Sequence, residues 1–191
     1  IPDVDKQVMH VTVSACSPSL ASDIIEVELL DKGQVIASAK GVQGKELRLA
    51  VKQPTLWEPS NPYLYDMKVR LTKNGREVDE VKSYTAFRKI STVRDAQGLM
   101  RMCLNDKPLF QYGPLDQGWW PDGLYTAPTD EALLYDIKKT KEWGFNMIRK
   151  HVKVEPARWY YHCDKEGILV WQDMPSGDMD NQWAPHVYNG G

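Results

Sequence analysis

The part of the sequence that most constrains the fold is residues 144–173, GFNMIRKHVKVEPARWYYHCDKEGILVWQD. Apolar runs at Phe145–Ile148 and Ile168–Trp171 predict strands, and the second run is continuous, as expected of a strand covered on both faces. Between them, Pro156 suits the first position of a helix and Gly167 suits its end. Strand, helix and strand at this spacing predict a parallel sheet.

The preceding residues extend this pattern. Leu109–Tyr112 predicts a short apolar strand, and Thr129 followed by two acids predicts the start of a helix that Gly144 ends. The order β-α-β-α-β is that of the first units of a TIM (β/α)8 barrel. Such a barrel takes roughly 250 residues. We therefore expect residues 90–191 to be the N-terminal part of a barrel domain, truncated after its third strand.

Residues 1–89 have a different hydrophobic pattern, in which apolar and polar residues alternate in short runs separated by turns. Lys73-Asn74-Gly75-Arg76 carries the Asn-Gly signal of a tight hairpin. Beyond this part, at the start of residues 90–191, a further hairpin is expected across Thr92–Phe110. The alternating runs predict an immunoglobulin-like antiparallel β-sandwich; they read VMHVTVSA, DIIEVELLD, QVIASAK, ELRLAVK and YLYDMKVRLTK.

Composition excludes several classes of protein. A net charge of −2 with 42% hydrophobic residues is typical of a globular protein and indicates no nucleic-acid partner. Cys16, Cys103 and Cys163 are too scattered for a zinc site or a disulfide framework. No apolar run reaches the roughly 18 residues of a membrane span. There is no signal peptide, but a leader could precede Ile1, so the compartment stays open, with a periplasmic or secreted location favoured over the cytoplasm.

Polar residues follow each predicted strand of the parallel sheet, where β/α barrels carry their reactive groups. Polar groups converging on one mouth suit a hydroxyl-rich ligand, and the adjacent Trp119-Trp120 could stack on a sugar face. The candidate residues are Asp116 and Gln117 after the first strand, Arg149, Lys150 and His151 after the second, and Gln172 and Asp173 after the third.

Each candidate also has a structural interpretation. Arg149 with Asp173 could be only a stabilising ion pair, or the arginine could orient a carboxylate. Asp116 could cap a loop, and the tryptophans could merely cover the barrel mouth. Asp116 and Asp173 could instead be the paired carboxylates of a glycosidase, which stand about 5–5.5 Å apart in retaining enzymes and about 6.5–9.5 Å apart in inverting ones. The sequence does not supply that distance.

Three runs, NDKPLFQYGPLDQG, LLYDIKKTKEWGFNMIRKH and EPARWYYHCDKEGILVWQD, resemble the start of the catalytic barrel of family 2 glycoside hydrolases. The preceding YTAFRKIS resembles the entry from their immunoglobulin-like domain. The resemblance implies a retaining exo-β-glycosidase, β-galactosidase- or β-mannosidase-like, with two catalytic glutamates. No Asn-Glu pair occurs in the chain, so both glutamates are expected outside it.

The resemblance further implies a carbohydrate substrate, with no cofactor and no metal. The expected substrate-binding residues are Asp116, Gln117, Trp119, Arg149, His151 and Asp173. Two other functions stay open: a non-catalytic carbohydrate-binding or adhesion module built on the sandwich, and a metal-dependent hydrolase using His151, Asp173 and Asp116. A truncated barrel would leave open sheet edges, so self-association through them is also expected.

Overall fold

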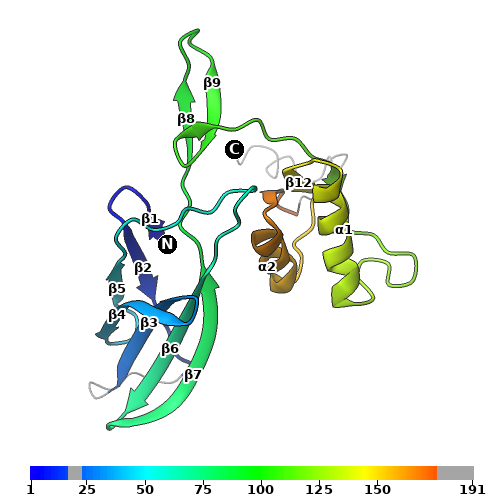
Figure 1. The fold of residues 1–191 in the computed structure, drawn as a ribbon. Helices are drawn as coiled ribbons and strands as arrows, with labels where there is room; N and C mark the ends of the chain where they lie inside the picture. The colour runs from blue at the N-terminus through cyan, green and yellow to red at the C-terminus, as the bar shows by residue number, and fades with distance from the viewer. Residues whose placement is uncertain (17–22, 176–191) are drawn as a thin grey trace, which may run out of the picture. The chain divides into compact units, whose positions relative to one another are not determined.

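The computed structural model describes residues 1–16 and 23–175. The chain divides into two compact units, Ile1–Phe110 and Gln111–Gly191, which are described in turn (Figure 1).

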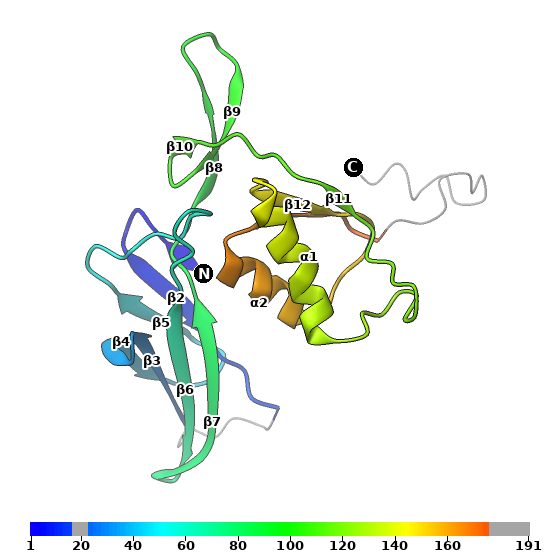
Figure 2. The ribbon, with the colours of Figure 1, turned by 45° about the vertical axis from the view of Figure 1, so that its right-hand side comes forward.

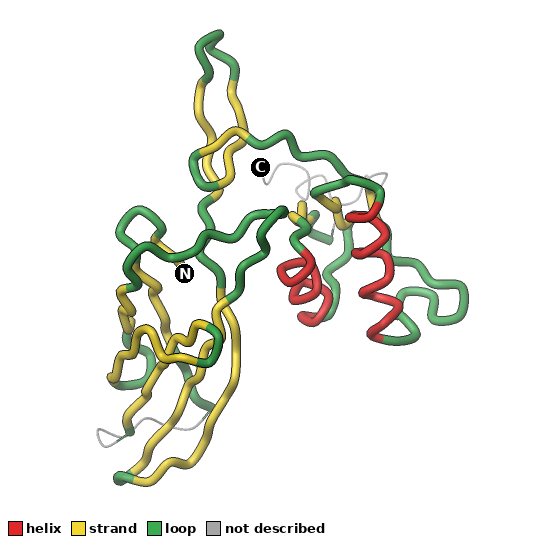
Figure 3. The backbone as a smooth tube through the Cα atoms, viewed as in Figure 1, coloured by secondary structure: helices red, strands yellow, loops and turns green. Residues whose placement is uncertain are grey.

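The first unit is built from antiparallel sheets, drawn in yellow in Figure 3. One sheet has the order β1-β2-β5 and a second the order β4-β3-β6-β7. The strands are β1 (Pro2–Asp3), β2 (Val8–Thr12), β3 (Ile24–Asp31), β4 (Gln34–Gly41), β5 (Glu46–Ala50), β6 (Tyr65–Lys73) and β7 (Arg76–Thr85).

The core of this unit lies between the sheets. Alternate residues of β3 are buried, and Val27 and Leu29 are fully inaccessible. This alternation is what one buried face of a sheet requires. The β-sandwich expected from the sequence is therefore confirmed. The buried cluster consists of Met9, Ile25, Val27, Leu29, Leu47, Leu49, Val51, Tyr65, Met67 and Phe87.

The hairpin at residues 73–76 is also confirmed. It joins β6 to β7, and Asn74 and Gly75 have φ values of 49° and 77°. Both central residues thus take the left-handed conformation that this turn demands.

A second hairpin follows the sandwich, formed by β8 (Ile90–Arg94), β9 (Met100–Leu104) and the short β10 (Lys107–Pro108). The hairpin is hydrogen-bonded to the rest of the first unit through the side chain of Asn105. The Asn105 amide nitrogen donates to Trp57 O at 3.0 Å, and the Asn105 amide oxygen accepts from Lys89 N at 3.0 Å. The hairpin consequently belongs to the unit that ends at Phe110, whereas the sequence analysis placed the boundary after residue 89.

The second unit contains a parallel sheet of β11 (Leu115–Asp116), β12 (Met147–Lys150) and β13 (Leu169–Gln172), in that order. Helix α1 (Asp130–Glu142) connects β11 to β12, and α2 (Ala157–Glu166) connects β12 to β13. Both helices lie along this sheet (Figure 2). Their buried residues form one cluster with the sheet, made of Leu133, Ile137, Ile148, Trp159, Cys163 and Ile168.

The predicted strand at Leu109–Tyr112 is wrong. Leu109 N still donates to Met102 O of β9, and Tyr112 N donates to the side chain of Asn146. Tyr112 O accepts from Asn146 N at 3.0 Å, but the registered parallel pairing starts with Leu115 opposite Arg149. The sheet's first strand is therefore β11.

The other strands begin later than the apolar runs suggested. β12 starts at Met147 and β13 at Leu169. Arg149, Lys150 and Gln172 consequently lie inside strands, where each side chain is committed to one face of the sheet, and only His151 and Asp173 follow the strand ends.

The helix ends agree closely with the sequence. Thr129 is the N-cap of α1, its side chain accepting from Ala132 N at 3.1 Å, and Gly167 ends α2 in the left-handed conformation. Pro156 is the N-cap of α2 rather than its first helical residue. Within the described ranges, neither helix has the length and apolar content to cross a membrane.

Candidate functional site

The register of the parallel sheet sorts the candidate residues onto opposite faces. Asp116, Lys150 and Gln172 lie side by side in one row, and Leu115, Arg149 and Trp171 in the neighbouring row. Because successive residues of a strand point to opposite faces, these rows point in opposite directions. The Lys150 ammonium lies 4.4 Å from the ring centroid of Trp159 on α2, so the first row faces the helices.

Lys150 is the centre of a buried ion-pair network on that face. Its side chain is 1% exposed, and its Nζ lies 2.6 Å from Asp116 Oδ2 and 3.0 Å from Glu155 Oε1. An ammonium so far from water is tolerated only when charged acceptors replace its hydration. Asp116 also accepts from Gly118 N at 2.7 Å, through Oδ1. Asp116 is thus fully engaged within the protein.

Lys153 extends the network toward the surface. Its Nζ lies 2.9 Å from Glu155 Oε1, donates to Gly118 O at 2.8 Å, and sits 4.4 Å from the ring centroid of Tyr125. The charged groups therefore run Asp116, Lys150, Glu155, Lys153, with carboxylate and ammonium alternating.

Arg149 and Asp173 form a separate ion pair. Arg149 Nε lies 3.1 Å from Asp173 Oδ1, and Nη2 lies 3.1 Å from Oδ2, so the contact is bidentate. The Arg149 guanidinium holds the pKa of the Asp173 carboxyl below its usual range, mainly through these hydrogen bonds. Asp173 is ionised at neutral pH and oriented by the arginine.

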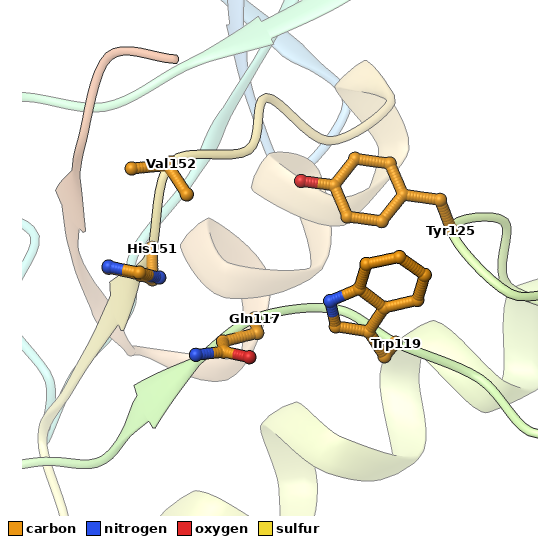
Figure 4. Close-up of a pocket in the computed structure, with 5 residues that line it drawn as sticks. All are labelled: Gln117, Trp119, Tyr125, His151 and Val152. Atoms are coloured by element: carbon orange, nitrogen blue, oxygen red, sulfur yellow. The ribbon is translucent and has the colours of Figure 1, made fainter. Parts of the chain in front are cut away.

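A pocket of about 290 Å³ lies where the chain leaves β11 and β12. Its lining residues are Gln117, Trp119, Tyr125, His151 and Val152. Figure 4 shows the rings of Trp119 and Tyr125 on one side and His151 with Val152 on the other. The ring centroids of Trp119 and Tyr125 are 4.8 Å apart at an interplanar angle of 56°.

The polar atoms of this pocket suit a hydroxyl-rich ligand. The indole nitrogen of Trp119 and the hydroxyl of Tyr125 point toward the side where His151 and Val152 lie (Figure 4). The Gln117 amide and the His151 imidazole add both donors and acceptors. Flat aromatic faces beside a few hydrogen-bonding groups can bind a pyranose ring.

The structure thus brings together three of the six residues expected to bind substrate: Gln117, Trp119 and His151. Asp116 lies in the ion-pair network with Lys150, and Arg149 with Asp173 forms its own pair. Asp116 is bonded to Lys150 on the face toward the helices, and Asp173 to Arg149 on the other face, so the arrangement does not support a pair of carboxylates acting on one bond.

The ligand set suggested for a metal-dependent hydrolase is not assembled either. Asp116 and Asp173 are committed to Lys150 and Arg149 on opposite faces. Across residues 1–16 and 23–175, no group of three or more His, Cys, Asp or Glu side chains is placed to hold a metal ion.

Sequence reasoning missed Tyr125, Lys153 and Glu155. Tyr125 lies in a turn-rich segment, and lysine and glutamate in a loop normally imply a solvated surface. One signal was present: the alternation of Val152, Lys153, Val154 and Glu155 puts both charged residues on the same side of an extended segment.

These features define a class: a β-sandwich followed by β-α-β units with an aromatic-walled pocket at the carboxyl ends of parallel strands. Residues 2–88 match the sequence model of glycosyl hydrolases family 2. The similarity to curated proteins extends further along the chain. A β-galactosidase of Lactococcus lactis subsp. lactis is 26% identical over 172 residues, which are 90% of this chain and 16% of that enzyme.

A β-galactosidase of Vibrio cholerae is 30% identical over 146 residues, which are 75% of this chain and 14% of the enzyme. The chain therefore spans less than a fifth of the length of either β-galactosidase. Among solved structures, the β-glucuronidase from Ruminococcus gnavus in complex with D-glucaro-d-lactam superposes with a TM-score of 0.72 at 22% identity, over 96% of this chain and 31% of that one. This last likeness shows a shared fold.

Proposed function

We propose that this chain is part of a retaining exo-β-glycosidase of glycoside hydrolase family 2, β-galactosidase- or β-mannosidase-like. In this proposal the sandwich is the family's immunoglobulin-like domain, and β11, β12 and β13 are the first strands of a TIM barrel. The match of residues 2–88 to the family and the similarity to β-galactosidases support it.

The observation that carries the proposal is the pocket of Gln117, Trp119, Tyr125 and His151. It lies at the carboxyl ends of parallel strands, which is where barrel enzymes bind their substrates. In the proposed role, Trp119 and Tyr125 present an aromatic surface to the apolar face of a sugar ring. Gln117 and His151 bond its hydroxyls.

Arg149 and Asp173 have a supporting role in this proposal. Their bidentate pair lies on the sheet face turned away from the helices, which would be the interior face of a closed barrel. An ionised carboxylate held by an arginine in that position can bond a sugar hydroxyl or orient a neighbouring group.

The bond-breaking step needs two carboxylates about 5–5.5 Å apart in a retaining enzyme. Glu155, the buried glutamate of the second unit, is held by Lys150 and Lys153 and is unavailable as a nucleophile or acid. We propose that the catalytic glutamates lie in parts of a longer protein outside residues 1–191, because the chain spans under a fifth of its β-galactosidase relatives.

The test has a catalytic arm and a binding arm. The 191-residue chain is assayed for release of the aryl group from aryl β-galactoside, β-mannoside and β-glucuronide. No turnover is expected, and clear turnover would overturn the placement of the glutamates. The same chain, labelled with ¹⁵N, is titrated with the corresponding methyl glycosides while its tryptophan indole signals are followed by NMR.

In the binding arm, the Trp119 indole signal should shift with one of the three sugars. Tyr125→Leu, which removes the other aromatic ring of the wall and leaves the Trp119 signal in place, should abolish the response. Tyr112→Leu is the matched control, because Tyr112 is also exposed, at 58% against 43% for Tyr125, and lines no pocket that Trp119 lines. A Trp119 signal that responds to none of the sugars would contradict the pocket's role.

The alternative of a binding module built on the sandwich gains no support from the structure. Trp57 and Tyr65, which could have formed a stacking surface, are 0% and 2% exposed. The Tyr63 hydroxyl donates to Asp31 Oδ1 at 2.5 Å, and this bond raises the pKa of Tyr63 to about 12. These aromatic side chains are committed to the sandwich itself.

A further inference from the structure

We propose that Lys153 is a positioning residue that holds the aromatic wall of the pocket, Trp119 and Tyr125, at a set distance from His151 and Val152. This inference rests on the proposed function for the meaning of the pocket, but its central claim concerns the free protein and can be tested without a sugar.

Lys153 belongs to the segment that forms the opposite wall. It follows His151 and Val152 directly, just beyond the end of β12. The aromatic wall comes from a different part of the chain, the segment from Gln117 to Tyr125 that follows β11. The two strands that precede these segments are paired as far as the hydrogen bond from His151 N to Asp116 O. Beyond that bond, the side chain of Lys153 joins one segment to the other.

The ammonium of Lys153 makes that contact at both ends of the aromatic segment. It donates to Gly118 O at 2.8 Å, next to Trp119, and lies 4.4 Å from the ring centroid of Tyr125. A cation at this distance from a ring is attracted to its face, more strongly when it is shielded from water. The Lys153 side chain is 5% exposed. One charged group therefore fixes both the backbone and a ring of the wall.

Lys153 is itself held by contacts to other parts of the second unit. Its Nζ is 2.9 Å from Glu155 Oε1, and Glu155 is held by Lys150 on β12. Its backbone oxygen accepts from Gln172 Nε2 at 2.8 Å, and Gln172 accepts from the Tyr160 hydroxyl. Through Glu155 and Gln172, Lys153 is therefore connected to the regular elements of the unit, β12, β13 and α2.

The surrounding backbone leaves little freedom for this arrangement. At Gly118, where φ is +69°, a Cβ atom would lie 2.6 Å from Glu155 Oε1 and 2.7 Å from Lys153 Nζ. At Val152 φ is +45°, a left-handed conformation that β-branched residues rarely adopt. Such a conformation persists only where its surroundings hold it. The contacts of the next residue, Lys153, are placed to do so.

These contacts also define what Lys153 does not do. Its ammonium is occupied by Gly118 O, Glu155 and the Tyr125 ring. Lys153 borders an adjoining hollow with Tyr125 and Val152, but it is not among the residues that line the pocket of Trp119 and His151. Its effect on a ligand must pass through the wall that it holds. It is a positioning residue and not a group that touches the substrate.

The test compares Lys153→Met with Lys165→Met. Methionine keeps most of the length of lysine and removes its charge. Lys165 is a matched control, since its ammonium also lies over a ring, that of Tyr161 at 5.8 Å, but on α2, and it lines no pocket that Trp119 or Tyr125 lines. The double variant Lys153→Met/Glu155→Gln removes the same contact while leaving Lys150 and Asp116 as a balanced pair, and it serves if the single variant does not fold.

The first measurement needs no ligand. The nuclear Overhauser effect between the rings of Trp119 and Tyr125 is recorded in the full chain and its variants. It should fall severalfold when Lys153 is replaced, and the Trp119 indole signal should move toward that of free tryptophan, while Lys165→Met changes neither. An unchanged ring–ring effect in a folded Lys153 variant would overturn the proposal.

The second measurement is the titration with methyl β-galactoside, methyl β-mannoside and methyl β-glucuronide. Replacing Lys153 should raise the dissociation constant about tenfold. The reason is that the free protein loses a charged hydrogen bond that holds the wall in its binding position, and the binding free energy weakens by roughly the contribution of that bond. An unchanged constant, with the ring–ring effect lost, would overturn the link between wall and binding. If the wild-type chain binds none of the sugars while the ring–ring effect still depends on Lys153, the proposed function fails and the positioning role stands.

Discussion

Among the described residues, the β-sandwich buries a single charged side chain, Asp23, beside its apolar cluster, whereas the second unit buries three, Lys150, Lys153 and Glu155, in one network. Apolar burial is non-directional and roughly proportional to area. Ion pairs with buried hydrogen bonds are directional, and their net contribution to stability is small or even unfavourable compared with apolar packing. The sandwich core thus serves stability, while the buried charges serve the placement of loops.

The largest effect should follow from breaking the charge network. Glu155→Leu would leave Lys150 and Lys153 buried with Asp116 as their remaining carboxylate. Removing one member of such a group typically costs about 3–5 kcal/mol of unfolding free energy. Hydrogen–deuterium exchange should report the loss in the second unit and unchanged protection in β3 and β6.

Adding Lys153→Met to Glu155→Leu is the matched control. It removes the extra positive charge, so the double variant should be more stable than Glu155→Leu alone. Equal stability of the single and double variants would contradict the view that uncompensated charge causes the loss.

In the sandwich, Leu29→Ala should cost about 3 kcal/mol by removing a fully buried side chain and leaving a cavity. The loss should appear as faster exchange in the strands of the β3 sheet. The Trp119–Tyr125 pocket is expected to stay unaffected, and a change in its indole signal would contradict the separation drawn between the units. Val93→Ala, in the exposed hairpin, is the control and should change little.

Matched glycine substitutions sharpen the same comparison. Gly118 and Gly33 both have positive φ, but a Cβ at Gly33 would meet no atom within 4 Å. Gly33→Ala in the β3–β4 turn should therefore cost about 1 kcal/mol from backbone strain alone. Gly118→Ala should cost about 2 kcal/mol or more, because it also displaces Lys153 and Glu155. Chemical denaturation measures both, and equal costs would argue against a tightly held network.

The smallest effect concerns the exposed Arg149–Asp173 pair. Arg149 lowers the pKa of Asp173, so the pair's contribution to stability is present above the unfolded pKa of about 3.9 and is lost as pH falls through the lower folded value. Arg149→Met should return the Asp173 pKa toward about 3.9 in a carboxyl ¹³C titration. Asp95, whose pKa is lowered by Arg101 in the hairpin, should titrate as before.

Much of the fold was predictable because it depends on local rules. Alternation identified the strands of the sandwich, and Asn74-Gly75 identified the hairpin. Thr129 and Gly167 marked the ends of helices through capping. Strand bounds in the parallel sheet were predicted less well. Registered pairing there starts at Leu115, and the apolar run before it forms no strand, since Leu109 is still bonded to Met102 of β9 and Tyr112 N is bonded to the Asn146 side chain.

The candidate site was predictable in part. Gln117, Trp119 and His151 lie at strand ends, a position that the β-α-β pattern already reveals. Asp116 was assigned to the site because the strand before it was placed too early. A shift of strand bounds changes which face a side chain reaches, and the true register turns Asp116 toward Lys150 and the helices.

The sequence by itself determined the kinds of elements and their order: alternating runs for a sandwich, then strands and helices for a parallel sheet. Those features follow from side-chain period and capping, which act within a few residues. Only the tertiary structure decided which charges meet. Lys153 reaches Gly118 across 35 positions of the chain, and Lys150 reaches Asp116 across 34. Such contacts depend on the register between strands and on the close approach that Gly118 permits, and neither is set by neighbouring residues.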